Sequence, residues 1–133
     1  MLRPLECLAQ NLFISPPTVS QWAGVFVFDC RTELEANVAR YAANRALLLD
    51  RLPGLGFDRL APADGAFYIY ADVARHTNDA EVFCRRMLNE AGVAATPGVD
   101  FDPINGRHFV RFSFAGTTPD MAEACDRLMA WKR

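Results

Sequence analysis

An arginine set within an apolar run is the feature of this chain that most suggests chemistry. Arg111 lies in the middle of residues 108–115, a strand-like run of aromatic residues with one valine. Holding a guanidinium in such a strand costs several kilocalories per mole unless an anion meets it. The anion can be a carboxylate of the protein, for which Asp72 is a candidate, or the carboxylate of a ligand bound through two parallel hydrogen bonds. The residues alone leave both interpretations open.

The remaining polar residues are weaker candidates for a catalytic centre. The only histidines, His76 and His108, have no neighbouring serine or cysteine with an acid that would complete a nucleophilic set, so we expect surface or rim positions. Asp100 and Asp102 could form a carboxylate pair, but they lie in a turn-rich loop over residues 97–106, where aspartate commonly serves the turns. Loops as long as residues 97–106 often take part in binding or catalysis.

Metal sites are not expected. The aspartates Asp58, Asp64 and Asp72 show no metal-site clustering, and the four cysteines at 7, 30, 84 and 125 contain no C-x-x-C pair and no adjacent histidine. Buried, reduced cysteines are therefore the expectation.

Composition narrows the class of protein. The chain has 133 residues, a net charge of −2 and 51% apolar residues, which fits one globular domain. No window approaches the apolar length of a membrane span, and residues 1–6 do not resemble a signal or transit peptide, so we expect a soluble, cytoplasmic protein. Its arginines are spread among 16 acidic residues without a basic stripe, which argues against nucleic acid as a partner.

Hydrophobic periodicity and turn residues predict an α+β fold, in which long helices precede a small mixed, mostly antiparallel sheet with helices packed on it. Thr32 and Glu35 form a capping box at the start of the longest helix, and Asn78 with Glu81 forms another. The expected helices are residues 18–29, 32–52, 78–91 and 118–131, and the expected strands are residues 57–60, 66–73, 93–96 and 108–115.

Three spaced stretches carry a resemblance to a known family. Residues 62–70 (PADGAFYIY), 89–101 (NEAGVAATPGVDF) and 109–116 (FVRFSFAG) resemble, in order, the C-terminal part of class I and II aminotransferases, which are pyridoxal-phosphate enzymes of the aspartate aminotransferase fold, fold type I. Residues 10–21 resemble the segment that follows the cofactor lysine in that family. The likeness covers essentially the whole chain.

The resemblance implies a role for Arg111. In the family, the arginine of the motif matching residues 109–113 binds the α-carboxylate of the substrate, while an amino group passes between an amino acid and a 2-keto acid in a ping-pong reaction. The salt bridge orients the substrate against the cofactor. The resemblance thus favours a substrate carboxylate as the partner of Arg111.

The resemblance also implies what this chain lacks. The family's Schiff-base lysine, phosphate-binding residues and pyridinium-binding aspartate precede the matching segment, and the single lysine, Lys132, follows the last helix and cannot substitute. We therefore expect residues 1–30 to be a remnant of the large-domain tail and residues 31–133 to be the small C-terminal domain. We expect this chain to contain no catalytic residue. Alone, it should neither bind the cofactor nor transaminate. Two alternatives stay open: a fragment of another fold-type-I enzyme, such as a lyase, or a non-catalytic interaction or dimerisation domain.

The helix expected at residues 18–29 is apolar nearly all round. Such a helix would pack against the large domain that the resemblance implies, and in isolation it should expose Trp22, Phe26 or Phe28. We therefore expect the isolated chain to form a homodimer, either through this helix or by exchange of residues 1–30.

Overall fold

The computed structural model describes residues 2–131. The chain divides into two compact units, which within these residues are 2–36 and 37–131. The boundary falls inside the longest helix, α3 (Arg31–Gly54). No helix among the described residues combines the length and apolar content needed to cross a lipid bilayer.

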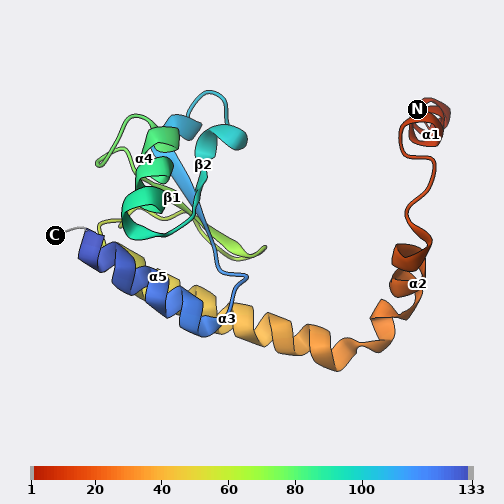
Figure 1. Ribbon diagram of the computed structural model, residues 1–133, viewed down its shortest axis with the longest axis horizontal. Helices are drawn as coiled ribbons and strands as arrows, with labels where there is room; N and C mark the ends of the chain where they lie inside the picture. The colour runs from red at the N-terminus through yellow and green to blue at the C-terminus, as the bar shows by residue number, and fades with distance from the viewer. Residues whose placement is uncertain (1, 132–133) are drawn as a thin grey trace. The chain divides into compact units, whose positions relative to one another are not determined.

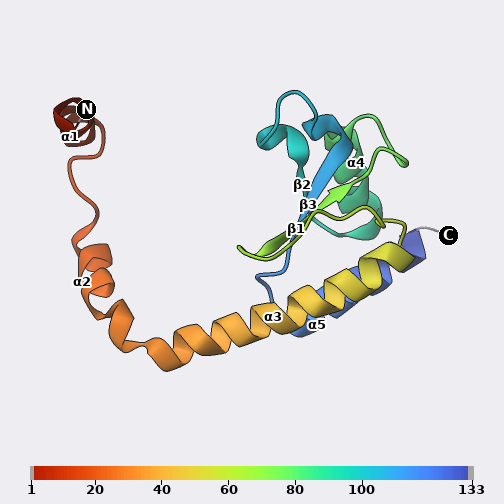
Figure 2. The ribbon, with the colours of Figure 1, turned by 180° about the vertical axis from the view of Figure 1, so that it is seen from behind.

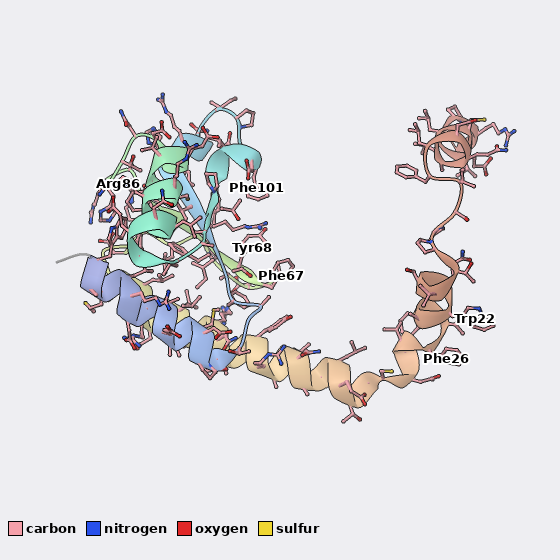
Figure 3. The ribbon with its side chains drawn as sticks, in the orientation of Figure 1. Trp22, Phe26, Phe67, Tyr68, Arg86 and Phe101 are labelled. Atoms are coloured by element: carbon pink, nitrogen blue, oxygen red, sulfur yellow. The ribbon has the colours of Figure 1, made fainter. Side chains whose placement is uncertain are left out.

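The first unit is helical and has no buried residue among those described. It contains α1 (Leu2–Leu12), α2 (Thr18–Phe26) and a short 3₁₀ turn, η1 (Val27–Asp29). Residues 15–17 separate α1 from α2, because proline lacks the N–H that a helix interior needs. The predicted exposure is confirmed: Trp22 is 60%, Phe26 57% and Phe28 85% exposed. The rings of Trp22 and Phe26 stack on α2 with centroids 6.2 Å apart, as labelled in Figure 3.

The second unit contains a three-stranded antiparallel sheet, so the predicted α+β class is confirmed. Its strands are β1 (Tyr68–Asp72), β2 (Thr96–Pro97) and β3 (Phe109–Ser113), in the order β1-β3-β2. The predicted strand over residues 57–60 is wrong, since only Leu60 forms an isolated bridge, to Ala71. The short second strand begins at Thr96 and ends at Pro97, which an edge strand tolerates because one side of it needs no hydrogen-bond donor.

Three helices accompany the sheet in this unit. The C-terminal part of α3 lies beside α5 (Thr118–Trp131), and both lie along one side of the sheet with α4 (Ala80–Arg86) nearby (Figures 1 and 2). Asp79, not Asn78, caps α4, since its Oδ1 accepts a hydrogen bond from the Val82 N–H at 3.0 Å. The helical run continues as a π turn, η2 (Met87–Ala91), and ends at Gly92, whose φ of 67° suits glycine.

A single apolar core lies between the inner face of the sheet and these helices. Alternation along the strands sends Ile69, Ala71, Val110 and Phe112 into the core, while Tyr68, Tyr70 and Arg111 lie on the opposite face. The helices and the segments between them supply the other main core residues: Leu48, Leu52, Leu55, Phe57, Phe83, Met87, Cys125 and Leu128.

Asn44 is fully buried in α3, although its polarity suggests a solvent-facing position. Its amide nitrogen donates to the carbonyl oxygens of Phe114 and Gly116, both at 3.0 Å, and its Oδ1 accepts from the Thr118 hydroxyl at 2.7 Å. Two of these hydrogen bonds run to the segment between β3 and α5, and the third runs to the first residue of α5. Asn44 therefore fixes the end of the central strand to the long helix.

Candidate carboxylate-binding site

Arg111 occupies the middle of the central strand and faces away from the core. Its register partners are Tyr70 in β1 and Thr96 in β2, so the strand that carries Arg111 is paired with a neighbour on each side. Its neighbours Val110 and Phe112 are buried in the core. The strand thus anchors the Arg111 backbone while the guanidinium projects on the outer face.

The guanidinium of Arg111 contacts two aromatic rings and one hydroxyl. Its Cζ lies 4.6 Å from the centroid of the Phe101 ring and 5.2 Å from that of Tyr68, and Nη2 donates to the Thr96 Oγ1 at 3.4 Å. The rings, labelled in Figure 3, stabilise positive charge but accept little hydrogen bonding. Nε is buried and has no hydrogen-bond partner. An anion would satisfy this donor.

No carboxylate among residues 2–131 forms an ion pair with Arg111. The structural alternative, a pair with Asp72, is wrong: Asp72 lies 3.0 Å from Arg59 and also accepts from the Ala74 N–H at 2.8 Å. Asp72 lies opposite Phe109 in the sheet, on the same face as the Tyr70–Arg111 pair and two residues along each strand from it. Arg111 thus has no acidic partner among the residues that the structure describes.

Arg111 lines a pocket of about 410 Å³ on the outer face of the sheet. Its walls come from the chain before β1, from β1 and β3 themselves, and from the loop that follows β2, and the lining residues are Ala61, Pro62, Tyr68, Tyr70, Phe101, Asp102 and Arg111. Apolar and aromatic walls around a few polar groups are typical of small-molecule sites.

The loop after β2 brings Phe101 and Asp102 to this pocket. It begins with the 3₁₀ turn η3 (Gly98–Asp100) and ends at η4 (Gly106–His108). The two glycines approach so closely that a Cβ at Gly98 would overlap the Gly106 carbonyl oxygen and the Tyr70 hydroxyl. Only glycine permits this closure, which holds Phe101 and Asp102 over the outer face of the sheet.

Asp102 accepts hydrogen bonds within its own turn, as expected, and it also lines the pocket. Its Oδ1 accepts hydrogen bonds from the backbone N–H groups of Ile104, at 2.9 Å, and Asn105, at 3.0 Å. These bonds, the one from Asn105 most strongly, hold the pKa of the Asp102 carboxyl below its usual range. Asp102 is therefore ionised at neutral pH, and its place in the pocket is a feature that the sequence did not reveal.

Tyr70 forms part of the pocket floor. Its ring stacks on Phe109 with centroids 4.9 Å apart and an interplanar angle of 5°, and its hydroxyl is buried without a hydrogen-bond partner. Burial raises the pKa of the Tyr70 hydroxyl, and the charge of Asp102 adds to that effect. The hydroxyl thus stays protonated.

The other polar candidates lie outside this pocket. His76 Nε2 is 2.8 Å from the Gly56 carbonyl oxygen, and His108 Nε2 accepts from Arg107 at 3.0 Å. Asp58 pairs with Arg75 at 2.7 Å, and Asp64 pairs with Arg45 at 3.4 Å. Within residues 2–131 no three metal-ligating side chains cluster. Lys132 lies outside the described residues.

All four cysteines are free thiols, but the expectation that they are buried holds for two of them only. Cys84 and Cys125 are buried in the second unit, whereas Cys7 is half-buried and Cys30 is exposed in the first.

Comparison with known proteins gives consistent matches along the chain. The family model described as aminotransferase class I and II matches residues 6–128. Valine–pyruvate aminotransferase of Mycobacterium tuberculosis is 50% identical over 131 residues, covering 97% of this chain and 34% of that protein. Aspartate/prephenate aminotransferase of Thermus thermophilus is 32% identical over 134 residues, covering 96% of this chain and 33% of that protein.

Solved structures give the same relation. The crystal structure of an aminotransferase from Mycobacterium tuberculosis superposes with a TM-score of 0.87 at 50% identity, covering 97% of this chain and 34% of that one. The chain thus spans about a third of the length of the curated relatives it matches.

Proposed function

Because the chain belongs to the class I and II aminotransferase family, we propose that it carries the part of an amino-acid aminotransferase that binds the substrate's α-carboxylate. The observation behind this proposal is Arg111, a partly buried guanidinium in a 410 Å³ pocket with an unpaired Nε and with no acidic partner among residues 2–131. Amino acids and 2-keto acids both present a carboxylate that an arginine fork can bind.

The surroundings of Arg111 suit it to positioning. Paired strands on both sides of β3 fix its backbone, and the rings of Tyr68 and Phe101 restrict its side chain. A carboxylate held by such a group loses much of its freedom before any reaction begins. The proposed contribution of this chain is thus orientation of the substrate.

The described residues fit the substrate and not the cofactor. Enzymes of this family use pyridoxal phosphate, which needs a lysine amine as its attachment point. Residues 2–131 contain no lysine, and Lys132 is the only one in the chain. We therefore propose that this chain by itself neither binds the cofactor covalently nor transaminates. Another fold-type-I reaction, such as β-elimination, would use the same carboxylate contact and stays an alternative.

Titration of the 133-residue chain with small substrates tests the proposal. The Mycobacterium relative is named for valine and pyruvate, so these are the first ligands to try. We expect millimolar-range binding by calorimetry that Arg111→Ala abolishes and Arg111→Lys weakens, because lysine keeps the charge and loses the fork. Arg75→Ala is the control, since Arg75 pairs with Asp58 outside the pocket. Binding that is unchanged in Arg111→Ala would refute the proposal.

The second candidate function is an interaction module, and the exposed apolar side chains of α1 and α2 favour it. Leu5 and Leu8 are exposed on α1, as are Trp22 and Phe26 on α2. We propose that these side chains drive homodimer formation, because large exposed apolar patches commonly mark association surfaces. Light scattering at micromolar concentration should show a dimer, and Trp22→Ser with Phe26→Ser should weaken it. A monomer at that concentration contradicts this candidate.

A further inference from the structure

The carboxylate pocket contains a second charge of opposite sign. Arg111 and Asp102 both line it, yet among residues 2–131 they form no ion pair with each other. Asp102 is held by two backbone hydrogen bonds within its own turn, and Arg111 by Thr96 and two rings. Each charged residue is therefore held by its own strand or loop, and both residues line the same pocket.

The two charges act differently on a ligand whose carboxylate is bound by Arg111. The rest of such a ligand lies within the pocket, between apolar walls formed by Ala61, Pro62 and the rings of Tyr68 and Phe101. An uncharged side chain suits these walls. A second carboxylate would instead share the pocket with the Asp102 carboxylate, and the two like charges would repel.

We propose that Asp102 makes this site selective for substrates with a single carboxylate, against dicarboxylic amino and keto acids. The inference rests on the proposed function, because Arg111 must first bind the α-carboxylate. Asp102 acts here as a specificity-determining residue. It remains charged at neutral pH because the Ile104 and Asn105 N–H groups stabilise its ionised form.

The test compares two keto acids of similar size, 2-oxohexanoate with one carboxylate and 2-oxoglutarate with two, by calorimetry on the 133-residue chain. Neither ligand has an amine, so attraction of an ammonium group to Asp102 plays no part. We expect the wild-type chain to bind 2-oxohexanoate about five- to tenfold more tightly than 2-oxoglutarate at low salt. Asp102→Asn should bring the two affinities to within about twofold, because the repulsive charge is gone.

Two controls separate charge from structure. An asparagine at 102 keeps the Oδ1 acceptor for the Ile104 and Asn105 N–H groups, so the turn should remain. Asp100→Asn removes an exposed carboxylate of the same loop that does not line the pocket, and it should leave the affinity ratio unchanged. Raising the salt concentration should narrow the ratio in the wild-type chain, which tests the charge effect without any substitution.

The outcomes distinguish this inference from the proposed function. In one outcome, both acids bind in an Arg111-dependent way, but neither salt nor Asp102→Asn changes the ratio of their affinities. That result overturns the role of Asp102 and leaves the carboxylate site intact. Absence of binding for both acids, or binding unaffected by Arg111→Ala, overturns both proposals. A ratio that narrows in Asp100→Asn as much as in Asp102→Asn also overturns the role of Asp102.

Discussion

Residues 2–36 and residues 37–131 are both rich in apolar side chains, but only the second part buries them. The helices α1 and α2 have no buried residue, whereas α3, α4, α5 and the three strands enclose one apolar core after residue 36. The carboxylate pocket lies entirely in the second part. The difference indicates that the second part is stabilised by its own contacts, while the apolar side chains of the first part remain exposed.

The largest loss of stability should come from truncating a core side chain in the second part. Leu52→Ala should lower the free energy of unfolding by about 3 kcal/mol, because Leu52 is fully buried and the substitution leaves a cavity. Leu8→Ala, in exposed α1, should change it by less than about 0.5 kcal/mol. The two tryptophans lie one in each unit, so urea unfolding followed by Trp131 fluorescence in a Trp22→Phe background reports on the second unit.

Equal losses of stability from the two leucine variants would contradict the comparison. That result would mean that the helices of the first unit contribute to the same cooperative structure as the core.

Thiol reactivity compares the same two parts without any substitution. Burial raises the pKa of Cys84 to about 11 and also raises that of Cys125, whereas Cys30 is exposed. Because the thiolate is the reactive form, Cys30 should be alkylated at neutral pH about a hundredfold faster than either buried thiol. Mass spectrometry of the labelled peptides measures each rate, and a Cys84 that reacts as fast as Cys30 would contradict the burial of α4.

A smaller effect is expected where a polar side chain joins elements within the second part. Asn44→Ala should cost about 2 kcal/mol, because three hydrogen bonds are lost and the carbonyl oxygens of Phe114 and Gly116 are left without that donor. Asn37→Ala, which removes an exposed asparagine contact to Arg40 on the same helix, is the matched control and should be near neutral. If the two variants have the same stability, Asn44 does not hold the strand end to α3.

The fold class and the helix pattern could be predicted because burial follows simple periodicities. Simple alternation along residues 66–73 puts Tyr68 and Tyr70 on the face opposite Ile69, which is the observed arrangement. The polarity of Asn44 suggests an exposed position, but its spacing, three residues after Tyr41 and four before Leu48, places it on the buried stripe of the helix. At the start of α4, both Asn78 and Asp79 can cap a helix, and propensity alone does not choose between adjacent candidates.

The site could be predicted only in part. Arg111 stands out because a charge in an apolar strand is unusual, and the loop over residues 97–106 stands out by its length. Neither signal places Asp102 in the same pocket as Arg111, because that arrangement depends on the close approach of Gly98 to Gly106. Pairing across a sheet and closure of a loop are tertiary facts, and no local pattern in the sequence specifies them.

The most direct test of the account follows the amide and arginine side-chain NMR signals of the 133-residue chain during titration with pyruvate. Binding through Arg111 in the second unit predicts shifts of the Arg111 Nε–H, Thr96 and Phe101 signals, none among residues 2–36, and loss of these shifts in Arg111→Ala. Shifts that persist in Arg111→Ala, or that concentrate among residues 2–36, would contradict the central claim that Arg111 binds the substrate's carboxylate.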